Sequence, residues 1–197
     1  MKAGQDQKGD DFVPVETEVK ISVDSFEDVR DNILKAGGSR ISSVYETNAM
    51  YDTLSGDLRK EDIGLRLRCE SDLHSNLRKD GPRGVTLTIK GPRASGNIKK
   101  RAEFELQMSD FENAGHMVES IGFSRRLAYE KKREIWALFG TKIFLDELPF
   151  GLYVEIEGEN DDILMAAKRL GFKERDFIKK NYLELAAENK ITGDIIF

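Results

Sequence analysis

The sequence has very few of the side chains that form disulfides and zinc sites. Its one cysteine, Cys69, permits no internal disulfide, and two histidines, His74 and His116, are too few for a Cys/His metal cluster. A bound metal would therefore be held by oxygen atoms, which hard cations such as Mg²⁺ and Mn²⁺ prefer. No hydrophobic run is long enough to cross a membrane, and the N-terminus lacks the apolar segment of a signal peptide. We therefore expect a cytoplasmic protein without a membrane partner.

An excess of positive charge is also missing. Thirty-one Lys and Arg residues stand against 36 Asp and Glu residues, a formal net charge of -5, which argues against general nucleic-acid binding. Charged residues make up 34% of the 197 residues and hydrophobic residues 39%, as in a polar globular domain. We expect a disordered leader over residues 1–11, a single domain over residues 12–190 and a short tail over residues 191–197.

The sequence does contain strands with one charged face and one apolar face. In residues 15–23, Glu16, Glu18 and Lys20 alternate with apolar residues such as Val19 and Ile21. Because side chains of a strand point alternately to its two faces, the charges share one face. Taken alone, this stretch is most simply interpreted as a half-buried strand whose charged face meets water.

The alternation recurs in the predicted strands at 63–70, 85–90, 99–106, 127–138, 142–148 and 152–157, and a further strand is expected over 40–53. Exposed ion pairs contribute only about 0–1 kcal/mol each, so charges this regular would gain little on scattered outer faces. We therefore predict an α+β fold: a closed antiparallel β-barrel whose ionic faces line a lumen and whose apolar faces pack under helices.

Helices are expected between some of these strands. One begins near Ser25 and ends at Gly37, another runs from Ser109 to Gly122, a third from 160 to 171, and a short one lies near 182–185. Residues 71–84, which include His74, have the composition of a loop. The predicted buried face of the first helix consists of Phe26, Val29, Ile33 and Leu34.

A lumen that holds several Arg and Lys side chains repels itself unless it takes up an anion. A polyanion satisfies many of these donors through forked contacts between guanidinium groups and phosphate. The carboxylates could hold divalent cations that bridge protein and phosphate oxygens. Cationic side chains that bind phosphate and carboxylates that bind a metal are together the components of a phosphoryl-transfer site.

The run Glu16-Thr17-Glu18-Val19-Lys20 resembles the Glu-x-Glu-x-Lys signature of the CYTH superfamily. These triphosphate tunnel metalloenzymes include class IV adenylyl cyclases, thiamine triphosphatases and inorganic triphosphatases. The resemblance covers residues 13–185. Further matching segments follow in family order, at Tyr51-Asp52-Thr53, Leu65-Arg66-Leu67-Arg68, Thr88-Ile89-Lys90-Gly91-Pro92, Arg101-Ala102-Glu103-Phe104-Glu105, Glu130-Lys131-Lys132-Arg133, Leu145-Asp146 and Gly151-Leu152-Tyr153-Val154-Glu155-Ile156-Glu157.

The resemblance implies an eight-stranded tunnel that binds a triphosphate along its axis, with Lys20 and Glu18 as catalytic residues. The phosphate ligands it implies are Lys20, Arg66, Arg68, Lys90, Arg101, Lys131 and Arg133. The ligands it implies for Mg²⁺ or Mn²⁺ are Glu16, Glu18, Asp146, Glu155 and Glu157, with Glu103 and Glu105 as ligands or supporting residues.

Two chemistries fit this resemblance. A metal-oriented water could hydrolyse inorganic tripolyphosphate or an organic triphosphate, or the ribose 3′-oxygen of ATP could attack the α-phosphorus to give cyclic AMP and pyrophosphate. The pattern is closest to the class IV cyclase branch, but Asp11-Phe12 stands where those cyclases carry His-Phe. We therefore favour hydrolysis and keep cyclisation as the alternative. A non-catalytic module that binds nucleotide or polyphosphate is a third hypothesis, and the oligomeric state stays open, with a homodimer among the options.

Overall fold

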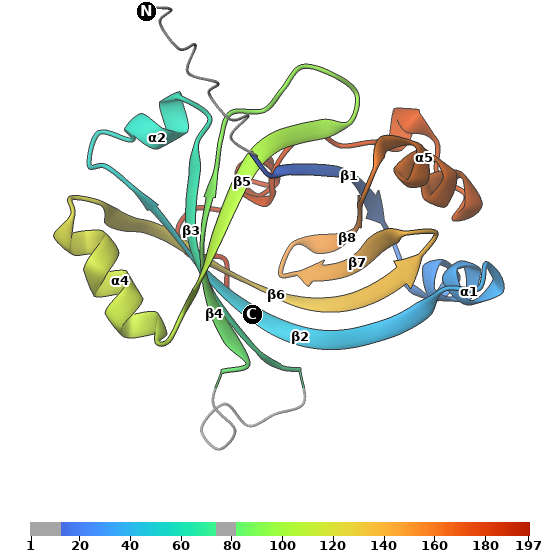
Figure 1. The fold of residues 1–197 in the computed structure, drawn as a ribbon, viewed down its shortest axis with the longest axis horizontal. Coiled ribbons are helices and arrows are strands. Elements are labelled where there is room, and N and C mark those ends of the chain that lie inside the picture. Colours follow the sequence, from blue (N-terminus) through green and yellow to red (C-terminus); the bar gives the residue numbers. More distant parts are fainter. Residues whose placement is uncertain (1–12, 74–81) are drawn as a thin grey trace, which may run out of the picture.

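The protein is a closed barrel of eight antiparallel strands in the computed structural model, which describes residues 13–73 and 82–197 (Figure 1). Around the barrel the strands follow the order β1-β5-β4-β3-β2-β6-β7-β8. This confirms the predicted fold class. The strands are β1 (Val15–Val23), β2 (Ser39–Asp52), β3 (Gly64–Asp72), β4 (Gly84–Lys90), β5 (Lys99–Met108), β6 (Ser124–Leu138), β7 (Thr141–Leu148) and β8 (Gly151–Glu157).

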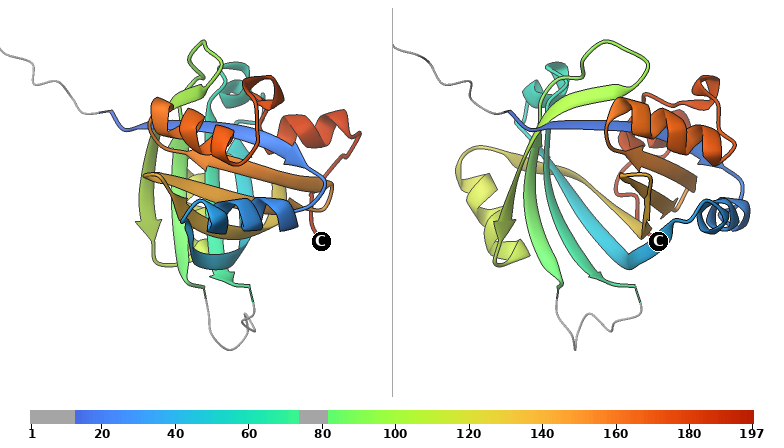
Figure 2. Two further views of the ribbon diagram at one scale, coloured as in Figure 1. Left: turned by 90° about the vertical axis from the view of Figure 1, so that its right-hand side faces the viewer. Right: turned by 45° about the vertical axis from the view of Figure 1, so that its right-hand side comes forward.

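The helices lie outside the barrel or across one of its ends, as the two views in Figure 2 show. No helix in the described part of the chain is both long enough and apolar enough to cross a membrane. The helices are α1 (Glu27–Lys35), α2 (Asp57–Lys60), α4 (Phe111–Ser120), α5 (Asn160–Arg169) and α6 (Tyr182–Glu188), with one 3₁₀ turn, η1 (Glu174–Asp176).

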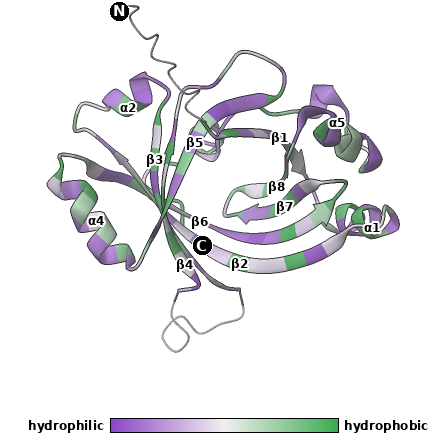
Figure 3. Ribbon diagram, viewed as in Figure 1, coloured by the Kyte–Doolittle hydropathy of each residue, from purple (hydrophilic) through white to green (hydrophobic). Residues whose placement is uncertain are grey.

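The hydrophobic core lies mostly on the outer face of the barrel. One cluster packs α1 and α5 against β1, β6, β7 and β8, and a second packs α4 against β2, β3 and β4. A third cluster, which includes Tyr129, Tyr153 and Tyr182, joins α6 to one end of the barrel. Figure 3 shows hydrophobic and hydrophilic residues interspersed along β2 and β6, as expected for strands with one face on the core and one on a polar lumen.

The structure corrects three details of the sequence prediction. Leu34 is exposed rather than buried with Ile33, because α1 buries only a narrow stripe. The N-cap of α4 is Asp110 instead of Ser109, and its carboxylate accepts a 2.7 Å hydrogen bond from the Asn113 amide. Strand β3 continues to Asp72, into the segment predicted as a loop. The predicted leader and His74 lie outside the described residues.

Two C-terminal segments complete the barrel wall where neighbouring strands diverge. β1 pairs with β5 only from Val15 to Glu18, and the Ile178 amide donates to the Lys20 carbonyl just beyond that ladder. Ile195 likewise bridges Tyr129 on the part of β6 that precedes its ladder with β7. The residues after β8 are therefore part of the tunnel wall.

Candidate functional site

The barrel encloses a cavity of about 730 Å³ that is lined by side chains from all eight strands. The ionic strand faces point inward, as the alternation predicts. All seven predicted phosphate ligands line this cavity, and so do the predicted acidic ligands except Asp146. Strand pairing thus brings side chains that are far apart in the sequence to one lumen.

Asp146 shares the inward face of β7 with Phe144, but it is fully buried and does not itself line the cavity. Its carboxylate accepts hydrogen bonds from Lys131 Nζ at 3.0 Å, from two guanidinium nitrogens of Arg133 at 2.6 and 2.5 Å, and from the Tyr182 hydroxyl at 2.7 Å. In this structure Asp146 therefore orients two cations of the lumen. The sequence resemblance gave no hint of the contact with Tyr182, which comes from helix α6.

Glu46 is a buried acidic residue that the sequence analysis missed. Its oxygens lie 3.4 Å from Lys131 Nζ and 3.6 Å from the Nε atoms of Arg68 and Arg133. Burial would raise the pKa of Glu46, but the surrounding cations, Arg68 foremost, hold that pKa well below its usual range. The sequence does indicate this position, because Glu46 and Asn48 are polar residues two positions apart and therefore share one face of β2.

Several polar atoms in this region are buried without a hydrogen-bond partner in the described part of the chain. They include Nε of Arg66, Nε of Arg68 and Oε1 of Glu46. Buried polar groups are nearly always satisfied in folded proteins, and leaving one unpaired costs about 1–3 kcal/mol. Arg66 and Arg68 both line the cavity, and Glu46, at 3.6 Å from Arg68 Nε, is too far to accept a hydrogen bond, so an anion in the cavity could supply the missing acceptors.

Carboxylates crowd together on the other side of the lumen, around β1, β5 and β8. Lys90 Nζ lies 2.6 Å from Glu16 and 3.0 Å from Glu103. Burial would raise the pKa of Glu16, but Lys90 outweighs it and lowers that pKa to about 2. Burial, with Glu16 close by, raises the pKa of Glu103 to about 7. Burial and the same neighbour also raise the pKa of Glu157.

This acidic group fits a divalent cation in its donor chemistry. Its members offer only carboxylate oxygens, and burial, together with the nearby charge of Glu16, raises the pKa of Glu103 and of Glu157. Within residues 13–73 and 82–197, no three acidic, histidine or cysteine side chains are already arranged to hold a metal ion. The acidic groups are instead held by lysines, as in the 2.5 Å contact between Lys99 and Glu18. Lys99 is a second residue of the lumen that the predicted site omitted.

Lys20 sits between the cationic and acidic sides. Its ammonium lies 2.7 Å from Glu155 and 3.8 Å from Glu18, and 4.4 Å from the centre of the Tyr182 ring. Burial would lower the pKa of Lys20, but Glu155 and Glu18 raise it above its ordinary value. With these carboxylates beside it, Lys20 carries a positive charge near neutral pH.

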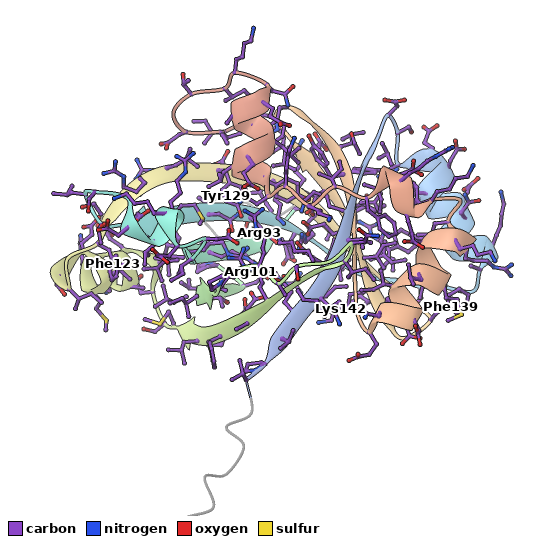
Figure 4. All side chains as sticks on the ribbon, turned by 90° about the horizontal axis from the view of Figure 1, so that it is seen from above. Arg93, Arg101, Phe123, Tyr129, Phe139 and Lys142 are labelled. Carbon is purple, nitrogen blue, oxygen red and sulfur yellow. The ribbon has the colours of Figure 1, made fainter. Side chains whose placement is uncertain are left out.

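Arg101 is placed differently from the other predicted phosphate ligands. Its guanidinium donates 2.7 Å hydrogen bonds to the carbonyl oxygens of Gly91 and Asp62. Nearby, Arg93 donates to the Asp62 carboxylate at 2.9 Å and pairs with Glu184 of α6, and Figure 4 shows the two arginines near the middle of the molecule. Arg101 thus supports the loop after β4 in this structure.

The CYTH domain model matches residues 15–189 of the chain, almost the whole of the described barrel. The chain belongs to the CYTH domain family. This confirms the resemblance drawn from the Glu16-Thr17-Glu18 run and the segments after it. No curated protein among those compared matches the CYTH chain described here.

Several solved structures have the same fold as this chain. A protein from Pyrococcus horikoshii OT3 is 26% identical, with a TM-score of 0.70, and the match covers 88% of this chain and 99% of that one. A putative adenylate cyclase from Vibrio parahaemolyticus is 20% identical, with a TM-score of 0.74 over 89% and 99% of the two chains. A putative adenylyl cyclase from Hippeastrum, described as having a dominant triphosphatase activity, is 15% identical, with a TM-score of 0.62 over 90% and 97%.

Proposed function

We propose that this CYTH protein is a metal-dependent enzyme of the cytoplasm that hydrolyses a triphosphate, either inorganic tripolyphosphate or an organic triphosphate. The observation that carries the proposal is that, in the described part of the chain, the buried Nε–H groups of Arg66 and Arg68 lack a hydrogen-bond acceptor, in a cavity that also holds Lys131 and Arg133. A chain of phosphates supplies acceptors spaced along such a row of donors. The dominant triphosphatase activity described for the Hippeastrum protein supports hydrolysis.

The acidic side of the lumen would hold Mg²⁺ or Mn²⁺ through Glu16, Glu18, Glu155 and Glu157, with Glu103 and Glu105 beside them. Bound there, the cation would supply charge neutralisation for the phosphate oxygens and activation of water. Lys99 and Lys90 now neutralise Glu18 and Glu16, so these lysines have to turn from the carboxylates toward the phosphates when the cation binds.

The cationic side would grip the phosphates through residues that are already oriented. Asp146 and Glu155 fix the Arg133 guanidinium, and Glu46 lies close to Arg68, Arg133 and Lys131. Lys20, which lies between the cationic and acidic sides of the lumen, would stabilise negative charge that develops at the phosphorus under attack. Pre-oriented charges of this kind stabilise the transition state without rearranging during the reaction.

The proposal is tested by product analysis. The purified protein is incubated with Mg²⁺ or Mn²⁺ and either tripolyphosphate or ATP, and orthophosphate, pyrophosphate and cyclic AMP are resolved. Orthophosphate without cyclic AMP is the expected result. Cyclic AMP with an equal amount of pyrophosphate would establish the cyclase instead, an activity consistent with the name of the Vibrio protein. Tight binding without any product would indicate the non-catalytic module.

Glu18→Ala tests the metal assignment. We expect at least a hundredfold loss of kcat/KM with the fold retained, because a carboxylate that holds the cation acts on the transition state. The matched control is Glu112→Ala on helix α4, an exposed glutamate outside the tunnel, which should keep wild-type activity. Unchanged turnover in Glu18→Ala would show that Glu18 holds no essential metal.

A further inference from the structure

Strand β5 has an edge that no other described strand covers. β1 pairs with β5 only as far as Ala102, and the Glu103 amide then donates one more hydrogen bond, to the Pro14 carbonyl. From there β5 continues to Met108 with β4 on one side and, in the described part of the chain, no partner on the other. The comparable gaps beside β1 and β6 are bridged by the C-terminal segments, so this gap differs from them in being open.

The backbone groups that point out of this edge can be assigned. In a strand, the N–H and C=O groups of successive residues point alternately to the two neighbouring strands. Glu103 donates toward β1, whereas the Ala102 carbonyl accepts from Gly91, just beyond β4. Glu105 and Gln107 follow Glu103 in this alternation, so their N–H and C=O groups point into the open edge. Unpaired backbone groups of this kind are a template for another strand.

The outer face of the sheet at this edge is apolar and exposed. Phe104 is 49% exposed and Leu106 is 65% exposed, and across the ladder with β4 they lie opposite Ile89 and Leu87. Neither Phe104 nor Leu106 belongs to an apolar cluster found among the described residues. Helix α4, which follows β5, packs against β2, β3 and β4 and therefore leaves the other side of β5 accessible. Exposed apolar side chains beside an unpaired edge favour pairing with another chain.

We propose that β5 pairs antiparallel with β5 of a second copy of this chain, about a twofold axis at Leu106. Antiparallel pairing lets one strand serve on both sides of a twofold interface, as a closed dimer requires. In this register the two Leu106 residues form a non-hydrogen-bonded pair, and Phe104 lies opposite Met108 of the second copy. Glu105 lies opposite Gln107 of the second copy on each side of the axis, and each of these pairs exchanges N–H···O=C hydrogen bonds.

The side chains favour this register over the neighbouring ones. An axis at Glu105 would place two carboxylates directly opposite each other, which is destabilising. An axis at Phe104 would direct the second strand to Glu103, whose amide is already bonded to the chain before β1. The axis at Leu106 instead places the Glu105 carboxylate opposite the Gln107 amide, an acceptor opposite a donor, on both sides of the axis.

The pairing brings the second copy to the wall of the tunnel. Glu105 lines the cavity, and its Oε1 atom accepts a 3.0 Å hydrogen bond from the Thr88 hydroxyl. Its Oε2 atom can accept a hydrogen bond from Gln107 of the second copy. The Gln107 amide donates one N–H to Thr86 within its own chain and has a second N–H to donate. Because one strand pair is a small interface, we expect a reversible dimer rather than a permanent one.

Disulfide cross-linking tests both the pairing and its register. Leu106→Cys is combined with Cys69→Ser, which removes the single native thiol. Opposed residues of a non-hydrogen-bonded pair have Cα atoms about 4.5 Å apart, within the range of a disulfide, so mild oxidation should yield a covalent dimer on non-reducing electrophoresis. Phe104→Cys in the same background is the matched control. It is exposed on the same face but would lie about 13 Å from its own counterpart, and should cross-link at least tenfold less.

Sedimentation velocity measures the dimer affinity without a cross-link. Gln107→Lys places an ammonium group opposite Glu105 and should lower the dimer Kd, whereas Gln107→Glu places a carboxylate there and should raise that Kd about tenfold. Asn113→Lys and Asn113→Glu make the same changes of net charge at an exposed position on helix α4. These two control variants should keep the Kd within twofold of wild type.

Three results would overturn the inference. The first is equal cross-linking of the two cysteine variants, and the second is a shift of Kd in the same direction for Gln107→Lys and Gln107→Glu. The third is a wild type that stays monomeric at every concentration at which it is soluble, including one that dimerises only when residues 1–11 are removed. Circular dichroism of each variant distinguishes the loss of the dimer from the loss of the fold. None of these results bears on the proposed triphosphatase activity.

Discussion

Replacing Glu46 with glutamine tests whether one buried carboxylate holds the cations of the tunnel together before ligand binds. Glu46 is fully buried and lies within 3.6 Å of Arg68, Lys131 and Arg133. Because these cations keep its pKa well below the usual range, Glu46 is ionised at neutral pH. The substitution therefore removes one negative charge and hardly alters the shape of the side chain.

The magnitude follows from the distances. Two unit charges about 3.5 Å apart attract by about 5 kcal/mol at an effective dielectric constant of about 20. The cost of taking the charges out of water offsets much of this attraction. Breaking a buried ion pair by removing one partner typically destabilises a protein by about 3–5 kcal/mol. We expect Glu46→Gln to lower the free energy of unfolding by that amount at pH 7. Total stabilities are about 5–15 kcal/mol, so the change is large.

The assay is urea unfolding followed by the fluorescence of the single, buried Trp136, with and without tripolyphosphate and with a chelator present. Phosphate would supply the negative charge that the variant lacks. Tripolyphosphate should therefore stabilise Glu46→Gln more than it stabilises the wild type. The matched control is Glu70→Gln, which loses a 3.2 Å ion pair with Arg68 at a partly exposed position and should change stability by less than about 1 kcal/mol.

Equal effects of the two substitutions would refute this reasoning. So would a Glu46→Gln variant as stable as the wild type, because removing the carboxylate shared by three cations would then cost nothing. A tripolyphosphate effect that is smaller in the variant than in the wild type would show that phosphate does not bind beside these cations.

Three further predictions concern other parts of the tunnel. Burial raises the pKa of Glu103 to about 7, so the folded state favours the protonated carboxyl. The resulting contribution to the free energy of unfolding is full below about pH 4.5 and is lost as the pH rises through 7. Glu103→Gln, which stays neutral, should match the wild type at pH 5 and exceed it by about 1–3 kcal/mol at pH 8 in metal-free urea unfolding; no difference between the two pH values would contradict the assignment. Tyr182→Phe removes one hydrogen-bond donor from Asp146 and should lower the free energy of unfolding by about 1–3 kcal/mol. Tyr182→Leu also removes the ring beside Lys20 and should lower it further. Equal losses in the two variants would rule out a stabilising contact between Lys20 and the ring. Gly38→Ala would place a Cβ atom 2.6 Å from Ile33 and 2.8 Å from a backbone oxygen. Thermal unfolding should therefore show a loss of stability of about 1–3 kcal/mol. An unchanged unfolding midpoint would show that the chain can move aside.

Much of the tunnel could be predicted from the sequence, because a strand with one ionic face and one apolar face has few stable positions. The charges of Glu16, Glu18 and Lys20 point to a lumen only when six other segments show the same alternation. Each of the predicted inward charges that follows this rule lines the cavity, except Asp146. The alternation of side chains along a strand determines the face to which a side chain points. It does not determine how far its charged end reaches into the lumen.

What the sequence could not reveal depends on partners far along the chain. The Asp146 carboxylate is covered by its hydrogen-bond donors, one of which, Tyr182, reaches it from a helix 36 residues later. Arg101 turns to backbone carbonyls because the loop after β4 folds beside it. The importance of Glu46 becomes visible only when Arg68, Lys131 and Arg133 are seen around it. None of these contacts follows from alternation or from a short motif.

The pairing of the first strand with the last has a consequence for synthesis of the chain. Glu18 of β1 pairs with Glu157 of β8, and Lys20 is bridged by Ile178. At about 5–20 residues per second, a ribosome takes about 7 to 28 seconds to add the roughly 140 residues between these partners. Throughout that time β1 has an unpaired edge and an uncovered apolar face, the combination that favours aggregation. The tunnel can therefore close only after the C-terminal segments have emerged.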